Sequence, residues 1–245
     1  MDLRKNEIGK IVGANLFKSF NTTPVLEDCS FSIRLGEITT IIGRSGCGKT
    51  TLLKCINGIE TIDSGQLFIE TQKGNIPFTE KKYKSNFGLV LQGGFLWRRK
   101  TILENITIAP LLLKHPKSET IDKAISLLKK FGIENKKNQY PENLSGGEQQ
   151  RAAIARALIM EPKILLLDEI TFSLDPFNKL DVLDTILKIK DEGFTVILVS
   201  HDISFSKKVS DSILYMNEGK ILESISKNNF ENSNGFGHDF LSLGV

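Results

Sequence analysis

A glycine-rich loop between a strand and a helix constrains the fold of this chain most. The stretch GRSGCGKT runs from Gly43 to Thr50, after a β-branched apolar run at residues 38–42 and before a helical pattern at residues 49–57. It fits the phosphate-loop pattern of glycine, four residues, glycine, lysine, and serine or threonine. Backbone N–H groups of such a loop point toward one anion, so the stretch predicts an α/β fold with a nucleoside triphosphate site. The expected nucleotide-binding residues of the loop are Gly43, Arg44, Ser45, Gly46, Cys47, Gly48, Lys49, Thr50 and Thr51.

A second apolar run, KILLLDE at residues 163–169, ends in two carboxylates. This is typical of a buried parallel strand whose C-terminal end opens onto the ligand crevice. Lys49 then supplies a point charge for the β- and γ-phosphates, and Thr50 and Asp168 are expected to bind Mg²⁺ or its waters. Glu169 is placed to orient, or to take a proton from, the water that attacks the γ-phosphate. The alternative is a strand that ends in solvated acids.

The stretch LSGGEQQR, from Leu144 to Arg151, opens a strong helical pattern with two adjacent glycines. Each glycine in a first helical turn costs about 1 kcal/mol relative to alanine. Ser145 and Glu148 have the spacing of a capping box, so one interpretation is a well-capped helix start. Capping does not call for two glycines, whereas an anion that binds exposed N–H groups at the positive end of a helix does.

Together with a histidine at the end of a later strand, in TVILVSHD from Thr195 to Asp202, these motifs resemble the nucleotide-binding subunit of an ATP-binding cassette (ABC) transporter. The resemblance covers about residues 11–225. Within that family, ENITIAP at 104–110, LLKCING at 52–58 and HDISFSKKVSD at 201–211 are most similar to bacterial importers of polar amino acids such as glutamine. The alternatives are an ABC ATPase of a non-transport membrane complex, in cell-envelope or cell-division signalling, an ABC system for lipoproteins or other substrates, and a soluble cassette that acts on DNA or ribosomes.

The resemblance implies a P-loop NTPase with a mixed, mainly parallel core sheet, an N-terminal antiparallel β subdomain and a helical subdomain. A chain of 245 residues can bury one full core, so we expect a single ABC ATPase domain. Its expected parts are the RecA-like core with the antiparallel β subdomain at about 1–92 and 151–225, the helical subdomain at about 93–150, and a tail at 226–245.

Local patterns predict several elements within these parts. Antiparallel strands are expected at 11–17 and 29–35, and a hairpin is expected around the turn at residues 217–219. A helix is expected to start at the cap Ser118 and to stop at Gly132. The tail is expected either to be partly disordered or to dock a final turn at HDFLSL, residues 238–243.

The resemblance also implies roles for residues outside the main motifs. Gln92 matches a glutamine that touches the metal and links the site to the helical subdomain, with a strand-end glutamine without a ligand as the alternative. His201 matches the histidine that binds the γ-phosphate; it is otherwise a polar residue beside a helix cap at Asp202. Asp175 matches an aspartate at the subunit boundary and is also an ideal helix N-cap. Phe20 stands where the family has an aromatic residue that stacks on adenine, and a core role is the alternative. The catalytic residues are then Glu169, His201 and Gln92, and the metal-binding residues are Thr50, Gln92 and Asp168.

The family arrangement implies that two copies pair head to tail on ATP and Mg²⁺. The signature residues Leu144, Ser145, Gly146, Gly147 and Glu148 of one copy then cap the nucleotide of the other copy. Gly147→Asp is accordingly expected to leave ATP binding nearly intact and to abolish turnover. The further partners implied are integral membrane permease subunits and, indirectly, an extracytoplasmic solute-binding protein.

Composition bounds the partners and the location. The net charge is only +3 and no dense basic stripe is present, so nucleic acid is not expected as a partner. No run approaches the roughly 18 apolar residues of a membrane span, and residues 1–10 are too polar for a secretion signal. Any membrane link must therefore be through another protein, and the family resemblance implies a peripheral subunit at the cytoplasmic face of the inner cell membrane. The three cysteines do not form a disulfide framework; Cys47 is either an accessible thiol whose alkylation blocks ATP or a small packed thiol.

Two stretches depart from the family pattern. QGGFLWRRKT, from residue 92, places Trp97, Arg98 and Arg99 where a permease helix would dock. The tryptophan is interpreted as a docking anchor or as half-buried packing. In DEITFSLD, Phe172 and Ser173 replace the small residues that are common in the family, which bears on the geometry between subunits.

Overall fold

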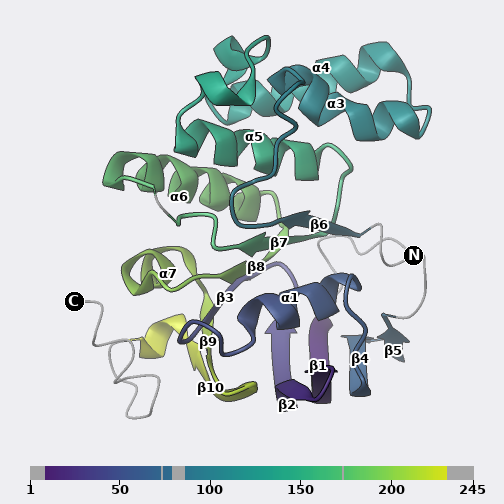
Figure 1. Cartoon of the computed structure of the whole chain (residues 1–245), viewed down its shortest axis with the longest axis vertical. Helices are drawn as coiled ribbons and strands as arrows, with labels where there is room; N and C mark the ends of the chain where they lie inside the picture. Colours follow the sequence, from purple (N-terminus) through teal and green to yellow (C-terminus); the bar gives the residue numbers. More distant parts are fainter. Residues whose placement is uncertain (1–8, 73, 79–85, 173, 231–245) are drawn as a thin grey trace.

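The structure is a computed structural model that describes residues 9–72, 74–78, 86–172 and 174–230. Two sheets and a layer of helices make up the molecule, with the helices α3, α4 and α5 at one end and the smaller sheet at the other (Figure 1). The predicted turn at HDFLSL lies outside the described residues, and so does Ser173.

The larger sheet has six strands in the order β10-β9-β3-β8-β7-β6. All neighbours are parallel except β9 and β10, which form the predicted hairpin around Glu218 and Gly219. Every residue of β3, β7 and β8 is buried, which explains why these strands are continuous apolar runs. The strands are β3 (Ile38–Ile42), β6 (Phe87–Val90), β7 (Ile164–Asp168), β8 (Thr195–Val199), β9 (Ser212–Asn217) and β10 (Lys220–Ser226).

The smaller sheet is antiparallel, in the order β2-β1-β4-β5. Its strands are β1 (Gly9–Phe20), β2 (Thr23–Arg34), β4 (Ser64–Thr71) and β5 (Gly74–Pro77). The first two strands are longer than the predictions of 11–17 and 29–35. The reason is that the β1–β2 ladder continues through register shifts near Asn15 and Asp28, which have positive φ values of 50° and 54°. Such bulges reset the alternation of apolar residues by which a strand is recognised in a sequence.

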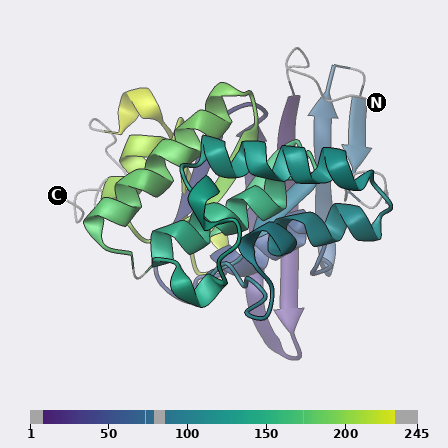
Figure 2. The same cartoon turned by 90° about the horizontal axis from the view of Figure 1, so that it is seen from above.

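Six α-helices cover the sheets: α1 (Lys49–Asn57), α3 (Ile102–Leu112), α4 (Lys117–Lys130), α5 (Gly146–Leu158), α6 (Pro176–Asp191) and α7 (Ile203–Val209), all within the described ranges. Short 3₁₀ turns lie at η1 (Glu134–Lys136), η2 (Pro141–Asn143) and η3 (Lys227–Asn229). Helices α3 and α4 lie side by side, and α5 packs against both of them (Figure 2). The boundary expected at residue 150 falls inside α5, which also packs on α6 and β6, so the division into subdomains stays a prediction.

The predicted cap of α4 is wrong. The helix begins at Lys117 with Pro116 as N-cap, and Ser118 lies inside its first turn. Pro116 already has a fixed φ, and its carbonyl accepts the backbone N–H of Thr120 at 3.0 Å, so the helix starts without a side-chain cap. The stop is as predicted, because α4 ends at Lys130 and Gly132 follows with φ 70°.

The core lies on both faces of the larger sheet. Leu165 and Leu167 of β7 belong to the cluster that joins the sheet to α3, α4, α5 and α6. Ile164 and Leu166 belong to the cluster that joins the sheet to α1 and the smaller sheet. Because alternate residues of one strand enter the two clusters, β7 is held from both sides and the position of its C-terminal end is well determined.

Candidate nucleotide-binding site

The phosphate loop connects the C-terminal end of β3 to the start of α1. Lys49 is buried, and its ammonium group donates to the carbonyl oxygens of Gly43 and Arg44, both at 2.9 Å. Gly46 and Gly48 have left-handed φ values of 80° and 107°. The crown of the loop, residues 44–46, is exposed. A loop that curls around a cation and presents its crown to solvent is suited to binding phosphate groups.

Asp168 ends β7 beside this loop. The hydroxyl of Thr50 donates to its Oδ1 at 3.1 Å, which joins two of the three expected metal-binding residues. Burial raises the pKa of the Asp168 carboxyl, against the opposing effect of the Thr50 hydrogen bond. A carboxylate that is desolvated in this way is stabilised by a nearby cation, and hydroxyl and carboxylate oxygens are the ligands that Mg²⁺ prefers. Among the described residues, no three or more His, Cys, Asp or Glu side chains form a group that could hold a metal ion.

Glu169 and His201 face each other at the same edge of the sheet. His201 Nδ1 lies 3.6 Å from Glu169 Oε1. Glu169 has φ 45°, and its backbone N–H donates to the carbonyl of Val199 at 2.9 Å, so the chain turns directly after β7. Asp202 is the N-cap of α7, as predicted, and accepts the backbone N–H of Phe205 at 2.9 Å. The side chains of Glu169 and His201 are thus held at the ends of β7 and β8.

Phe172 contacts this pair. Its ring meets the His201 ring edge to face, with 5.7 Å between the centroids. The sequence shows Phe172 only as a departure from the family pattern, because its partner is 29 residues further along the chain. The phenylalanine therefore restricts the orientation of the histidine.

Gln92 follows β6, the edge strand that pairs with β7, and is exposed. The strands β6, β7, β8 and β3 are parallel, so Gln92, Asp168, His201 and the phosphate loop all lie along one edge of the sheet. Within the described residues, no hydrogen bond joins the Gln92 side chain to Asp168. The structure therefore places Gln92 at the same edge of the sheet as the other predicted site residues, and its contact with a metal stays a prediction.

The signature stretch starts α5 with the expected capping box. Ser145 Oγ accepts the backbone N–H of Glu148 at 3.2 Å, and Glu148 Oε2 accepts the backbone N–H of Ser145 at 2.8 Å. The two glycines have neighbours that the sequence did not reveal. A Cβ on Gly147 would lie 2.2 Å from Asn178 Oδ1, and a Cβ on Gly146 would lie 2.9 Å from Leu174 Cδ2. Packing against α6 therefore gives a reason for Gly147 that does not involve a bound anion, whereas at Gly146 the obstacle is only the end of a leucine side chain.

Asp175 is the N-cap of α6, as its spacing predicts. Its Oδ1 accepts the backbone N–H groups of Phe177 and Asn178, both at 3.0 Å. These hydrogen bonds, first of all that of Asn178, hold the pKa of Asp175 below its usual range. Asn178 also contacts Ser145 Oγ at 3.2 Å, so the Asp175 turn is tied to the signature turn. In the described part of the chain, no hydrogen bond or ion pair joins the signature turn to the phosphate loop.

Phe20 is the last residue of β1 and is 42% exposed, which is too exposed for a core role. The Lys18 ammonium lies 5.2 Å from the centre of its ring. Phe20 lies at the end of β1 in the β1–β2 hairpin. This hairpin is near the phosphate loop, because a Cβ on Gly48 would lie 2.8 Å from the carbonyl oxygen of Val25 in β2. The ring is thus partly exposed, with the Lys18 ammonium over it, and stacking on adenine stays a prediction.

Cys47 is buried within the loop at 8% exposure, which favours the packed thiol over the accessible one. Its backbone carbonyl accepts the N–H of Gly219 at 3.0 Å. Burial also raises the pKa of Cys29 to about 12 and that of Cys55 to about 11. All three cysteines are free and buried.

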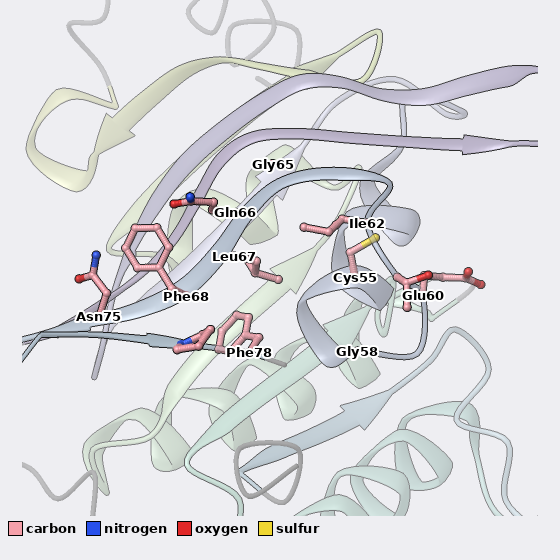
Figure 3. A pocket seen from close by; sticks show the side chains of 12 residues that line it. Cys55, Gly58, Glu60, Ile62, Gly65, Gln66, Leu67, Phe68, Asn75 and Phe78 are labelled. Carbon is pink, nitrogen blue, oxygen red and sulfur yellow. The ribbon is translucent and has the colours of Figure 1, made fainter. Parts of the chain in front are cut away.

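A separate cavity of about 730 Å³ lies at the other end of α1 (Figure 3). Its walls come from β4, β5 and the end of α1, and they include Cys55, Gly58, Leu67, Phe68 and Phe78. The phosphate loop precedes the first residue of α1, whereas Gly58 follows its last. None of the predicted nucleotide-binding or catalytic residues lines this cavity.

Comparisons with known proteins agree with this geometry. The sequence profile described as "ABC transporter" matches residues 26–172. The glutamine transport ATP-binding protein GlnQ of Geobacillus stearothermophilus is 44% identical over 208 residues, which cover 84% of this chain and 86% of the relative. The glutamate/aspartate import ATP-binding protein GltL of Escherichia coli K12 is 39% identical, with 88% of this chain and 90% of the relative covered.

A similar solved structure is a dimeric ATP-binding cassette in a post-hydrolysis state, bound to ADP and phosphate. It has a TM-score of 0.77 and 29% identity, and the match covers 89% of this chain and 98% of that one. The fold and the site define an ATP-binding cassette ATPase. The chain belongs to the ABC transporter family.

Proposed function

We propose that this chain binds MgATP at the phosphate loop and hydrolyses it between two paired copies. The observation that carries the proposal is the convergence of the loop, Asp168, Glu169 and His201 at one edge of the sheet. Lys49 and the loop N–H groups would hold the phosphates, and Thr50 and Asp168 would hold Mg²⁺. The metal would neutralise phosphate charge during transfer.

Glu169 is the proposed general base. Its side chain is partly exposed next to His201, so it can reach a water that a bound γ-phosphate positions. His201 would donate a hydrogen bond to the γ-phosphate, in an orientation that Phe172 restricts. Gln92 would contact the metal from the end of the neighbouring strand β6. Ser145 and the first turn of α5 would cap the triphosphate of the partner copy, as the dimeric cassette of similar structure suggests.

The chain would power the import of a polar amino acid. Its relatives are named for glutamine, glutamate/aspartate and arginine transport, the last being ArtM of Bacillus subtilis at 42% identity. None of the helices in the described part of the chain combines the length and apolarity that crossing a bilayer requires. As the transport names of the relatives suggest, permease subunits would supply the pathway, with a solute-binding protein outside and this chain as a peripheral subunit at the cytoplasmic face.

Hydrolysis and import are tested separately. Glu169→Gln is expected to lower kcat by about 10²- to 10⁴-fold, with little change in ATP affinity, because only the proton acceptor is lost. It should also trap an ATP-bound dimer, which light scattering can detect. Uptake of radiolabelled glutamine, glutamate and arginine by cells that carry the intact complex identifies the substrate. If the complex hydrolyses ATP but takes up none of these amino acids, the proposal of import is rejected. The proposal that the chain hydrolyses ATP would still stand.

A further inference from the structure

The segment after Gln92 has an unusual backbone. Gly93, Gly94 and Phe95 have successive left-handed φ values of 83°, 68° and 42°. Phe95 is 68% exposed and Trp97 is 48% exposed on the same segment. A short loop with this conformation has little stability of its own, so its position depends on what holds it.

The helix α5 holds the segment through one arginine. Arg156 Nη2 donates to the carbonyl of Gly94 at 2.7 Å, and Nη1 donates to the carbonyl of Phe95 at 2.8 Å. No carboxylate pairs with this guanidinium in the described residues, and burial lowers the pKa of Arg156. Gly94 is pressed against the same helix, because a Cβ on it would lie 3.1 Å from Ala153 Cβ. The charge of Arg156 is therefore directed to the loop.

The helix α3 holds the segment through a fully buried asparagine. Asn105 is 0% exposed, and its Oδ1 accepts the backbone N–H of Trp97 at 2.7 Å. Its Nδ2 donates to the carbonyls of Trp97 and Lys100, at 3.1 and 3.0 Å. This residue belongs to the ENITIAP stretch, for which the nucleotide chemistry above gives no role. A buried side-chain amide with both groups satisfied by one loop specifies the conformation of that loop.

We propose that Asn105 and Arg156 are positioning residues that fix the segment 93–100 to α3 and α5, so that the helices set the position of Gln92. The inference rests on the proposed ATPase and assigns residues that act through Gln92.

Trp97 is the only tryptophan of the chain, so its fluorescence reports on the segment directly. Arg156→Lys keeps the charge but cannot reach both carbonyls with a rigid fork. Asn105→Leu keeps the volume and loses every hydrogen bond to the segment.

For both full-length variants we expect quenching of Trp97 by acrylamide to rise at least about twofold. We expect kcat to fall about tenfold or more, with the KM for ATP within about twofold, because the segment is misplaced while the phosphate loop is intact. Arg34→Lys, on a side chain that is 72% exposed, is the matched control and should change neither readout.

Unchanged quenching in a folded variant overturns the proposal, and so does unchanged kcat when quenching has risen. Hydrogen exchange of the unaltered protein provides a test that needs no variant. The amide of Trp97 is expected to be protected as well as the interior amides of α3, and exchange at the rate of an exposed loop would refute the inference. If Glu169→Gln still hydrolyses ATP at the parent rate, the proposed function fails, whereas the fluorescence and exchange results stand on their own.

Discussion

The phosphate loop and the signature turn both place glycines where a helix begins, yet for different physical reasons. Gly48 has φ 107°, and a Cβ there would lie 2.8 Å from a backbone oxygen of β2. Gly146 and Gly147 are in ordinary helical conformation, and the obstacles to a Cβ are side chains. The first requirement belongs to the backbone of the loop itself, whereas the second belongs to the packing of α5 against α6 and the turn before it.

The largest effect is expected at Gly48. Gly48→Ala combines a left-handed alanine with a clash against the carbonyl of Val25, which cannot move without the strand. The loss of unfolding free energy should be about 2–4 kcal/mol, with ATP affinity falling at least about tenfold. Urea unfolding and binding of a fluorescent ATP analogue measure the two.

Gly46→Ala is the control for this prediction, because Gly46 has φ 80° and open space around a Cβ. It should lose about 1–2 kcal/mol from strain alone. Equal losses at the two positions would show that the contact with Val25 is unimportant.

An intermediate effect is expected at Gly147. Gly147→Ala should lower the unfolding free energy by about 1–3 kcal/mol, because the methyl group meets Asn178. In an Asn178→Ala background the loss should be smaller but should not vanish, because alanine removes the amide group and keeps the Cβ atom, which would lie 2.8 Å from the new methyl group. A double-mutant cycle measures this rescue.

If Gly147→Ala is as harmful without Asn178 as with it, the packing account of the signature turn is wrong. The same contact changes what Gly147→Asp can show. A larger side chain meets Asn178 before any nucleotide binds, so that variant disturbs the turn as well as the charge facing a γ-phosphate.

The phosphate loop and the signature turn also differ in the pKa of the aspartate beside each of them. Burial raises the pKa of Asp168 beside the phosphate loop, whereas hydrogen bonds lower that of the exposed Asp175 beside the signature turn. A raised pKa in the folded state means that ionised Asp168 opposes folding as pH rises through that value. Asp168→Asn should therefore raise the Tm of the nucleotide-free protein by about 2–4 °C at pH 8, and the gain should vanish in acid.

Asp175→Asn should do the opposite at neutral pH, because its carboxylate favours folding until the pH falls through its lowered pKa. Thermal unfolding from about pH 2 to pH 8 compares the two variants, because the lowered pKa confines the change at Asp175 to pH values below about 4. A gain for Asp168→Asn that does not depend on pH would mean that the carboxyl is not the cause. The variant should also lose Mg²⁺-dependent hydrolysis.

The features that the sequence predicted differ from those that it did not predict in how far apart the contacting residues lie along the chain. The phosphate loop, β7 and the caps at Ser145 and Asp175 depend on neighbours within a few residues, and short patterns describe such neighbours well. The contacts of Gly147 with Asn178 and of Phe172 with His201 span about 30 residues, so no local pattern contains them. The start of α4 was missed although it is local, because a proline before the helix replaced the side-chain cap that the pattern favoured at Ser118.

The smallest effect is expected at Gly146, where the obstacle is the far end of a leucine. A Cβ there would lie 2.9 Å from Leu174 Cδ2, and a rotation of that side chain relieves the contact. The cost of moving the leucine opposes a helix-propensity gain of about 1 kcal/mol, so Gly146→Ala should change the unfolding free energy by less than about 0.5 kcal/mol. Urea unfolding distinguishes this small change from the loss at Gly147.

A Gly146→Ala variant that is near-neutral in stability but no longer turns over ATP would separate the packing requirement from the nucleotide requirement. Packing would tolerate the methyl group, and the remaining obstacle would be the nucleotide of the partner copy. A loss as large as that of Gly48→Ala would instead show that the backbone at the start of α5 is as constrained as the phosphate loop, which would end the distinction between the two turns.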